Sequence, residues 1–333
     1  MSQITVVDGD FTAHLRRYLD NTISQDPVCE LKALVYDRFA VYRTHLDFLR
    51  AGAKIIRTNT ARVTPISVAR HLEIFGSEAH SIITIAVELA QKAVFKYYEE
   101  IGGDTSNVEQ FKKCRPLVAG HCASYAVSRL DSNGPVNYWR NVEEQDLVKC
   151  HRARIQILLN SGVDLLAFEN IPCRMEAEVL VDLLRQFRNA RVWMSFVCCN
   201  DKKLLDGSSF LEMATYCYFS LPEQVLAIGA ICPSLENEIS LLENVYINSF
   251  ENNIPMIMYL QGKNEKKKTR KYAMHWVEEF MSLGVIYISG KSGATAEEIR
   301  LLHNAVQESL GFARPNSVAT KTCSQNEENK PKL

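Results

Sequence analysis

The chain has 333 residues, of which 47% are hydrophobic and 23% are charged, and its formal net charge is −1. This composition is typical of a globular protein with a sizeable core, and the charge gives no electrostatic basis for binding nucleic acid or an acidic membrane surface. The first residues show neither a basic region nor a long apolar segment, so we expect no signal peptide, and no stretch reaches the roughly 18 apolar residues that cross a bilayer. We therefore expect a cytoplasmic protein that binds neither nucleic acid nor a membrane.

Short apolar runs rich in β-branched residues alternate with longer amphipathic stretches along the chain. The apolar runs predict strands over 4–7, 54–58, 117–121, 165–168, 192–197, 226–231, 255–259 and 285–288. The stretches between them predict helices over 37–50, 81–99, 143–160, 175–187, 235–249 and 270–283, with a further helical pattern over 296–302. This alternation is typical of βα units and a parallel sheet.

Glycines mark the ends of three predicted helices. Gly52, Gly162 and Gly284 each stand just before a predicted strand, and glycine after a helix is a common stop signal. Eight βα units in about 300 residues fit a closed (β/α)8 barrel, the TIM-type α/β fold, better than an open sheet. We predict a single barrel domain over 1–312. The remaining residues, 313–333, are rich in Ser, Asn, Glu and Lys and predict a disordered tail.

Polar residues stand at the end of each predicted strand, where a barrel of this kind carries its chemistry. They are Asp8, 58–60, 121–122, 169–170, 198–199, Cys232, Tyr259 and 290–292. Taken singly, a polar residue at a strand end is as often a helix cap or a solvated loop residue. Taken together they predict a pocket. We expect it to bring together Asp8, Thr58, Glu169, Cys232 and Lys291.

Several segments carry a resemblance to a known family. They are 7–10 in the first predicted βα unit, 44–53 with 58–60 in the second, 151–152 with 161–172 in the fourth, 193–196 with 206–207 in the fifth, and 227–229 with Cys232 in the sixth. In order and spacing they resemble the homocysteine S-methyltransferase family, and the resemblance covers residues 4 to about 310.

The resemblance implies a zinc ion at the barrel mouth, held by one cysteine after the sixth strand and a Cys-Cys pair after the eighth. Zinc would lower the thiol pKa of homocysteine, whose thiolate takes a methyl group from S-methylmethionine or S-adenosylmethionine to give methionine. Cys232 matches the first zinc ligand, and Glu169 matches the acidic residue that grips the amino acid. The implied substrate-binding set is completed by Asp8, Thr58, Asn59 and Tyr259. The implied partner is homocysteine or a methionine derivative.

The chain departs from the family pattern at this mouth. Lys291 and Ser292 stand where the Cys-Cys pair is expected. A protonated lysine has no lone pair and serine is a poor zinc ligand, so we expect zinc binding to be weak or absent. Lys291 is expected to extend into solvent, to pair with Glu169 or to stabilise a Cys232 thiolate. Other departures from the family pattern are at Ala61, 123–126, Ile231 and 259–261.

Two functions remain open at this point, and no residue is certain to be catalytic. The chain is either an S-methyltransferase of homocysteine or a related thiol with a rearranged site, or a catalytically silent family member. A silent member would bind a small amino-acid-like ligand or a protein partner. Cys198, Cys199 and His121 offer substitute metal ligands beside Cys232, but neighbouring strand residues point to opposite faces. The two adjacent cysteines are therefore more readily interpreted as ordinary thiols.

Overall fold

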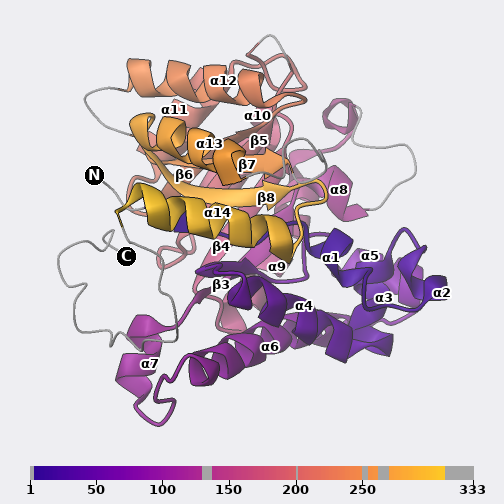
Figure 1. Ribbon diagram of the computed structural model, residues 1–333. Helices are drawn as coiled ribbons and strands as arrows, with labels where there is room; N and C mark the ends of the chain where they lie inside the picture. Colours follow the sequence, from indigo (N-terminus) through magenta and orange to yellow (C-terminus); the bar gives the residue numbers. More distant parts are fainter. Residues whose placement is uncertain (1–3, 130–136, 200–201, 250–253, 262–269, 312–333) are drawn as a thin grey trace.

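The computed structural model describes residues 4–129, 137–199, 202–249, 254–261 and 270–311 (Figure 1). The predicted tail over 313–333 lies outside these residues. The described strands are β1 (Thr5–Val6), β2 (Ile55–Arg57), β3 (Leu117–Ala123), β4 (Leu165–Ile171), β5 (Val192–Val197), β6 (Val225–Ile231), β7 (Met256–Gln261) and β8 (Val285–Lys291). All eight predicted strands are thus present, with end points that differ by a few residues.

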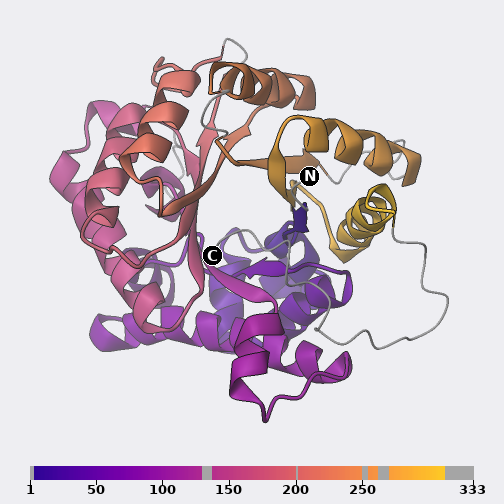
Figure 2. The ribbon, with the colours of Figure 1, turned by 90° about the vertical axis from the view of Figure 1, so that its left-hand side faces the viewer.

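The strands form one parallel sheet in the order β1-β8-β7-β6-β5-β4-β3-β2. A parallel bridge between Val7 and Ile55 joins the two ends of this sheet. Around that bridge the Lys54 N–H donates to the Val6 carbonyl at 2.8 Å, and the Asp8 N–H donates to the Ile55 carbonyl at 3.0 Å. These contacts close the sheet on itself, which confirms the predicted (β/α)8 barrel. Figure 2 shows the helices arranged around its outside.

Long helices cover the outer face of the barrel. They are α4 (Arg38–Arg50), α6 (Gly76–Glu100), α9 (Glu144–Asn160), α10 (Arg174–Leu184), α11 (Phe210–Ser220), α12 (Leu235–Asn248), α13 (Arg270–Ser282) and α14 (Ala296–Ser309). The sequence analysis missed α11, because apolar side chains occur almost all round that helix and give no clear helical period. Gly52, Gly162 and Gly284 have φ values of +105°, +82° and +76°. They confirm the predicted helix ends, since glycine adopts this left-handed conformation without strain.

Several short helices were not predicted, because three to eight residues are too few to show a period. They are α1 (Phe11–Leu15), α2 (Asn21–Ser24), α3 (Cys29–Tyr36), α5 (Pro65–Leu72), α7 (Val108–Cys114), α8 (Tyr125–Arg129) and the 3₁₀ helix η1 (Tyr138–Arg140). Figure 1 shows α1, α2, α3 and α5 grouped at the side toward which β8 points. This is the mouth of the barrel, formed by the C-terminal ends of the strands. Within the described ranges, none of the helices combines the length and the apolar character needed to cross a membrane.

The core has two layers. A large outer layer fills the space between strands and helices, and a smaller one fills the barrel interior. The interior layer consists of Val7, Ile55, Ala119, Leu165, Ala167, Trp193, Ala227, Ile257, Tyr259 and Tyr287. Side chains alternate along a strand, so the residue two positions after an interior residue also points inward. This places Arg57, His121 and Glu169 above the interior layer, at the mouth.

Candidate functional site

A pocket of about 270 Å³ lies at the mouth of the barrel. Its lining includes four of the five residues expected to bind substrate, together with the pair that replaces the expected cysteines: Thr58, Asn59, Glu169, Tyr259, Lys291 and Ser292. The fifth, Asp8, is fully buried beside the lining residue Gly9. Arg57 and His121 also contribute to the lining. The sequence thus indicated the position of the pocket.

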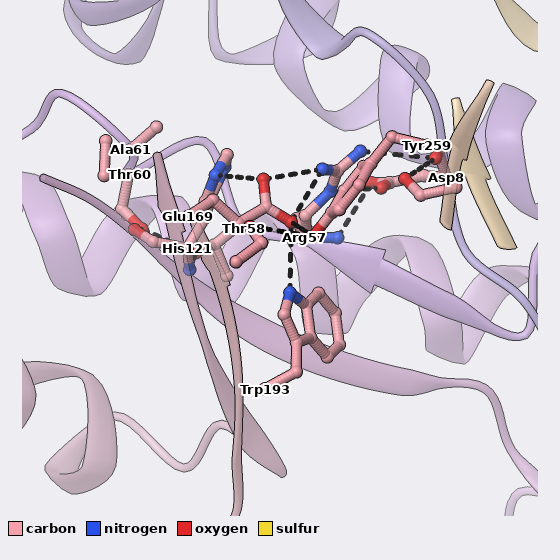
Figure 3. Close-up of polar contacts among 12 residues, drawn as sticks. Asp8, Arg57, Thr58, Thr60, Ala61, His121, Glu169, Trp193 and Tyr259 are labelled. Carbon is pink, nitrogen blue, oxygen red and sulfur yellow. Dashed lines mark hydrogen bonds and ion pairs between the residues drawn. The ribbon is translucent and has the colours of Figure 1, made fainter. Parts of the chain in front are cut away.

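Arg57 lies at the centre of this site and is only 7% exposed (Figure 3). Its Nε donates to Asp8 Oδ1 at 2.7 Å, and its Nη1 donates to both carboxylate oxygens of Glu169 at 3.1 and 2.9 Å. Its Nη2 donates to the carbonyl oxygens of Asp8 at 3.2 Å and Gly9 at 2.8 Å. The backbone N–H of Arg57 also donates to Asp8 Oδ2 at 2.8 Å. All three guanidinium nitrogens therefore donate to acceptors within the protein.

Glu169 accepts further contacts from three other strands. Trp193 Nε1 donates to Oε1 at 3.0 Å, and the Tyr259 hydroxyl donates to the same oxygen at 2.9 Å. His121 Nε2 lies 2.9 Å from Oε2. Figure 3 shows the Glu169 carboxylate between His121 on one side and Arg57 on the other.

The charges of this cluster are shaped by burial and by each other. Burial opposes the charge of Glu169, but Arg57 and then His121 hold the pKa of this carboxyl well below its ordinary value. Burial has the larger effect at Asp8 and raises its pKa, although Arg57 acts in the opposite direction. Burial also opposes the charge of Arg57, but Glu169 and then Asp8 raise its pKa overall. Arg57 and Glu169 therefore form a buried ion pair.

Tyr259 reaches Glu169 because a glycine on the neighbouring strand leaves room for it. A Cβ atom at Gly229 would lie 2.7 Å from Ile257 Cγ2 and 3.2 Å from the Tyr259 ring. The Tyr259 hydroxyl also lies 3.1 Å from Ser195 Oγ. The Tyr259 side chain thus extends from β7 toward Ser195 of β5, with its hydroxyl oxygen directed at the carboxylate of Glu169.

The polar residues after β2 fasten the mouth as well as lining it. Thr58 Oγ1 accepts a hydrogen bond from the His121 N–H at 3.0 Å and lies 2.7 Å from Thr60 Oγ1. Thr60 Oγ1 in turn donates to the His121 carbonyl at 2.8 Å. Asn59 Nδ2 donates to the Glu30 carbonyl of α3 at 2.8 Å. These bonds connect the end of β2 to β3 and to the helices over the mouth.

Lys291 has a partner that the sequence analysis did not foresee. Its amino group forms an ion pair with the carboxylate of Glu238 on α12, and its Nζ lies 3.4 Å from the Cys232 carbonyl oxygen. The Lys291 side chain is 12% exposed and that of Glu238 is 0% exposed. Burial raises the pKa of Glu238 to about 7, although Lys291 acts in the opposite direction. Lys291 therefore neither extends into solvent nor pairs with Glu169 or the Cys232 thiol.

The side chains around Cys232 do not fit the zinc ion implied by the resemblance. Cys232 and Cys198 are both buried, and Cys198 Sγ donates to the Phe196 carbonyl at 3.7 Å, whereas Cys199 is exposed. A lysine that is already paired with a carboxylate contributes no lone pair to a metal. No cluster of three or more His, Cys, Asp or Glu side chains suited to a metal ion occurs in the part of the chain that the structure describes.

Two residues of the site escaped the sequence analysis. Arg57 falls within the predicted strand over 54–58, and its role was not predicted. A charged residue in an otherwise apolar strand is the signal of a buried ion pair that could have indicated it. Glu238 lies on the buried face of α12 with Ile239 and Leu242. It gave a weaker signal, since acidic residues are common in the first turn of a helix.

Comparisons with known proteins agree with this geometry. Residues 5–306 match the sequence model described as homocysteine S-methyltransferase. The chain is 29% identical over 301 residues to a betaine-homocysteine S-methyltransferase of Drosophila melanogaster, covering 86% of this chain and 89% of the relative. It is 29% identical over 317 residues to homocysteine S-methyltransferase 2 of Arabidopsis thaliana, covering 90% and 91%. The metallated crystal structure of the homocysteine methyltransferase MmuM from Escherichia coli superposes with a TM-score of 0.75 at 26% identity, covering 91% of this chain and 96% of that one.

Proposed function

Because this chain belongs to the homocysteine S-methyltransferase family, we propose that it is a member without zinc-dependent methyl transfer that keeps the mouth of the barrel as a binding site for a small amino-acid-like molecule. The observation that carries this proposal is the ion pair between Lys291 and Glu238. Lys291 stands where the resemblance to the family implies a zinc-binding cysteine, and its amino group is already paired with a carboxylate.

The replacement removes the means of activating a thiol. A free thiol with a pKa of about 8.5 is only slightly ionised at neutral pH, and a bound metal is the usual way to obtain the thiolate. Lys291 supplies a positive charge in the same region, but Glu238 already neutralises that charge. A thiol that enters this pocket therefore meets no strong source of activation, and methyl transfer to it is expected to be slow.

The pocket itself is retained. Its volume of about 270 Å³ is sufficient for a small amino acid derivative, and Thr58 and Asn59 are among the polar residues that line it. We assign these two residues to direct ligand contact. We assign Asp8, Glu169 and Tyr259 to the support of the pocket wall, since their polar atoms contact Arg57 or one another. The similar proteins from D. melanogaster and A. thaliana are named for homocysteine, which makes this amino acid and its derivatives the first ligands to test.

The test uses the purified full-length protein. We expect far less than one equivalent of bound zinc and no transfer of a methyl group from S-methylmethionine to homocysteine above the uncatalysed rate. Calorimetry with homocysteine, methionine and their N-acetyl and 2-oxo analogues should detect binding of at least one compound. Stoichiometric zinc together with turnover would overturn the catalytic half of the proposal. Absence of binding by every compound would overturn the ligand half and favour a protein partner.

A further inference from the structure

We propose that Arg57 is a built-in occupant of the cation-binding position of the pocket, and that it determines specificity by excluding ligands that present an ammonium group there. This inference rests on the proposed function and narrows its ligand class. The pocket should accept amino acid derivatives that lack a free ammonium group, such as N-acyl or 2-oxo compounds, in preference to the zwitterions.

Donors of the protein already contact every oxygen of the two carboxylates. A carboxylate offers about four lone-pair positions. Glu169 already receives two contacts from Arg57 Nη1 and one each from Trp193, Tyr259 and His121. Both oxygens of Asp8 are occupied by the side chain and the backbone of Arg57. Asp8 is fully buried and is not among the residues that line the pocket, so a ligand ammonium group could reach its carboxylate only by displacing Arg57.

The Arg57 side chain is also fixed in place by its hydrogen bonds. Its three guanidinium nitrogens donate to five acceptor atoms on Asp8, Gly9 and Glu169. The side chain is almost completely buried, and removal of one partner from a buried ion pair leaves an uncompensated charge. A ligand would thus have to separate two buried carboxylates from their own cation before it could use them.

Arg57 also borders the pocket directly. Arg57 and Glu169 both line the cavity, and Figure 3 shows the Arg57 side chain extending from Glu169 to Asp8. Shortening this side chain would leave two buried carboxylates facing the same space. Such a space should bind a small planar cation, because charge-assisted, bidentate hydrogen bonds to carboxylates favour guanidinium groups.

The test is to remove the internal cation and supply one from solution. Arg57→Ala should bind methylguanidinium about tenfold or more tightly than the wild type, as measured by calorimetry and by the rise in melting temperature. Arg57→Ala with Glu169→Gln should lose most of this gain. Arg17→Ala is the matched control, since it removes an exposed arginine that pairs with Glu297 and should show no gain. Equal binding of methylguanidinium by Arg57→Ala and the wild type would overturn the proposal.

A second measurement serves if Arg57→Ala does not fold by itself, because two buried carboxylates lose their partner in this variant. The variant is then refolded with methylguanidinium or with tetramethylammonium, which cannot donate a hydrogen bond. Recovery of the native circular dichroism spectrum with methylguanidinium alone supports the proposal. Failure with both cations, or equal recovery with both, overturns it. These outcomes do not depend on zinc content or turnover, so failure here is distinguishable from failure of the proposed function.

Discussion

Glu238 combines complete burial with a single cationic partner, Lys291. Its pKa in the folded protein is about 7, compared with an ordinary value of 4.5, because burial outweighs the effect of Lys291. A carboxyl whose pKa is raised by folding binds its proton more tightly in the folded state. Its contribution to stability is therefore complete below pH 4.5 and is lost as the pH rises to about 7.

This linkage predicts a difference between the wild type and Glu238→Gln. The free energy of unfolding of the wild type, minus that of the variant, should fall by about 3 kcal/mol as the pH rises from the ordinary to the folded pKa. Urea unfolding at a series of pH values measures it. A difference that stays constant or increases with pH would show that Lys291 fully compensates the burial of the carboxylate.

Individual residues of the site differed in how well the sequence foretold them. Positions at strand ends were recognisable, because polar residues follow apolar runs at regular intervals, and Glu169 and Tyr259 do line the pocket. Their partners were not recognisable. Arg57 and Glu169 are 112 residues apart, and Lys291 and Glu238 are 53 apart. No local pattern indicates which of the many charged residues meets a given lysine or arginine in a closed barrel.

At the scale of elements, the strands and the long helices other than α11 were predicted well, because each has a clear period or an apolar run with a stop signal. The range predicted for β5, 192–197, agrees with the structure at both ends. The short helices α1, α2, α3 and α5 were missed. They form the side of the mouth that carries Glu30, whose carbonyl accepts the hydrogen bond from Asn59. The wall of the pocket was thus less predictable than its floor.

The first and last loops of the barrel are fastened together where a glycine allows close contact. The Asp10 N–H donates to the Ala294 carbonyl at 2.7 Å, and the Gly293 N–H donates to Asp10 Oδ2 at 2.8 Å. A Cβ atom at Gly9 would lie 2.1 Å from that Ala294 carbonyl oxygen and 3.0 Å from Phe48 Cε1. No side chain can be accommodated there unless the two loops separate.

We therefore expect Gly9→Ala to lower the free energy of unfolding by about 2–3 kcal/mol, the usual cost of overpacking a buried position. Gly76→Ala is the control, because Gly76 has a φ of +59° and no atom within 4 Å of an added Cβ. That variant should lose only about 1 kcal/mol from backbone strain. Urea unfolding of both variants measures the difference, and equal losses would show that the loops separate without cost.

At the scale of the whole molecule, the contacts that close the barrel are separate from the contacts at its mouth. The ring of strands closes through backbone hydrogen bonds and an apolar interior, neither of which involves the expected metal position. The closure of the barrel therefore does not depend on a metal at its mouth. The Lys291–Glu238 pair connects β8 to α12.

The last prediction concerns the return of the metal. Lys291→Cys with Ser292→Cys places three thiols at the mouth with Cys232, which suits the tetrahedral preference of zinc. Without zinc, the double variant should unfold more easily than the wild type, because Glu238 remains buried without its partner. Zinc should bind near one equivalent and raise the melting temperature, whereas Lys291→Ala with Ser292→Ala should show neither effect.

Zinc binding should nevertheless return without methyl transfer. Arg57 still occupies Asp8 and Glu169 in the double variant, so an amino acid would enter the pocket with no acceptor for its ammonium group. Metal analysis and a transfer assay with S-methylmethionine and homocysteine examine the same preparation. Turnover restored by the two cysteines alone would mean that Arg57 does not obstruct the substrate. Zinc binding without turnover would place the second barrier to catalysis at Arg57, since the metal would then be present while the carboxylates remain occupied.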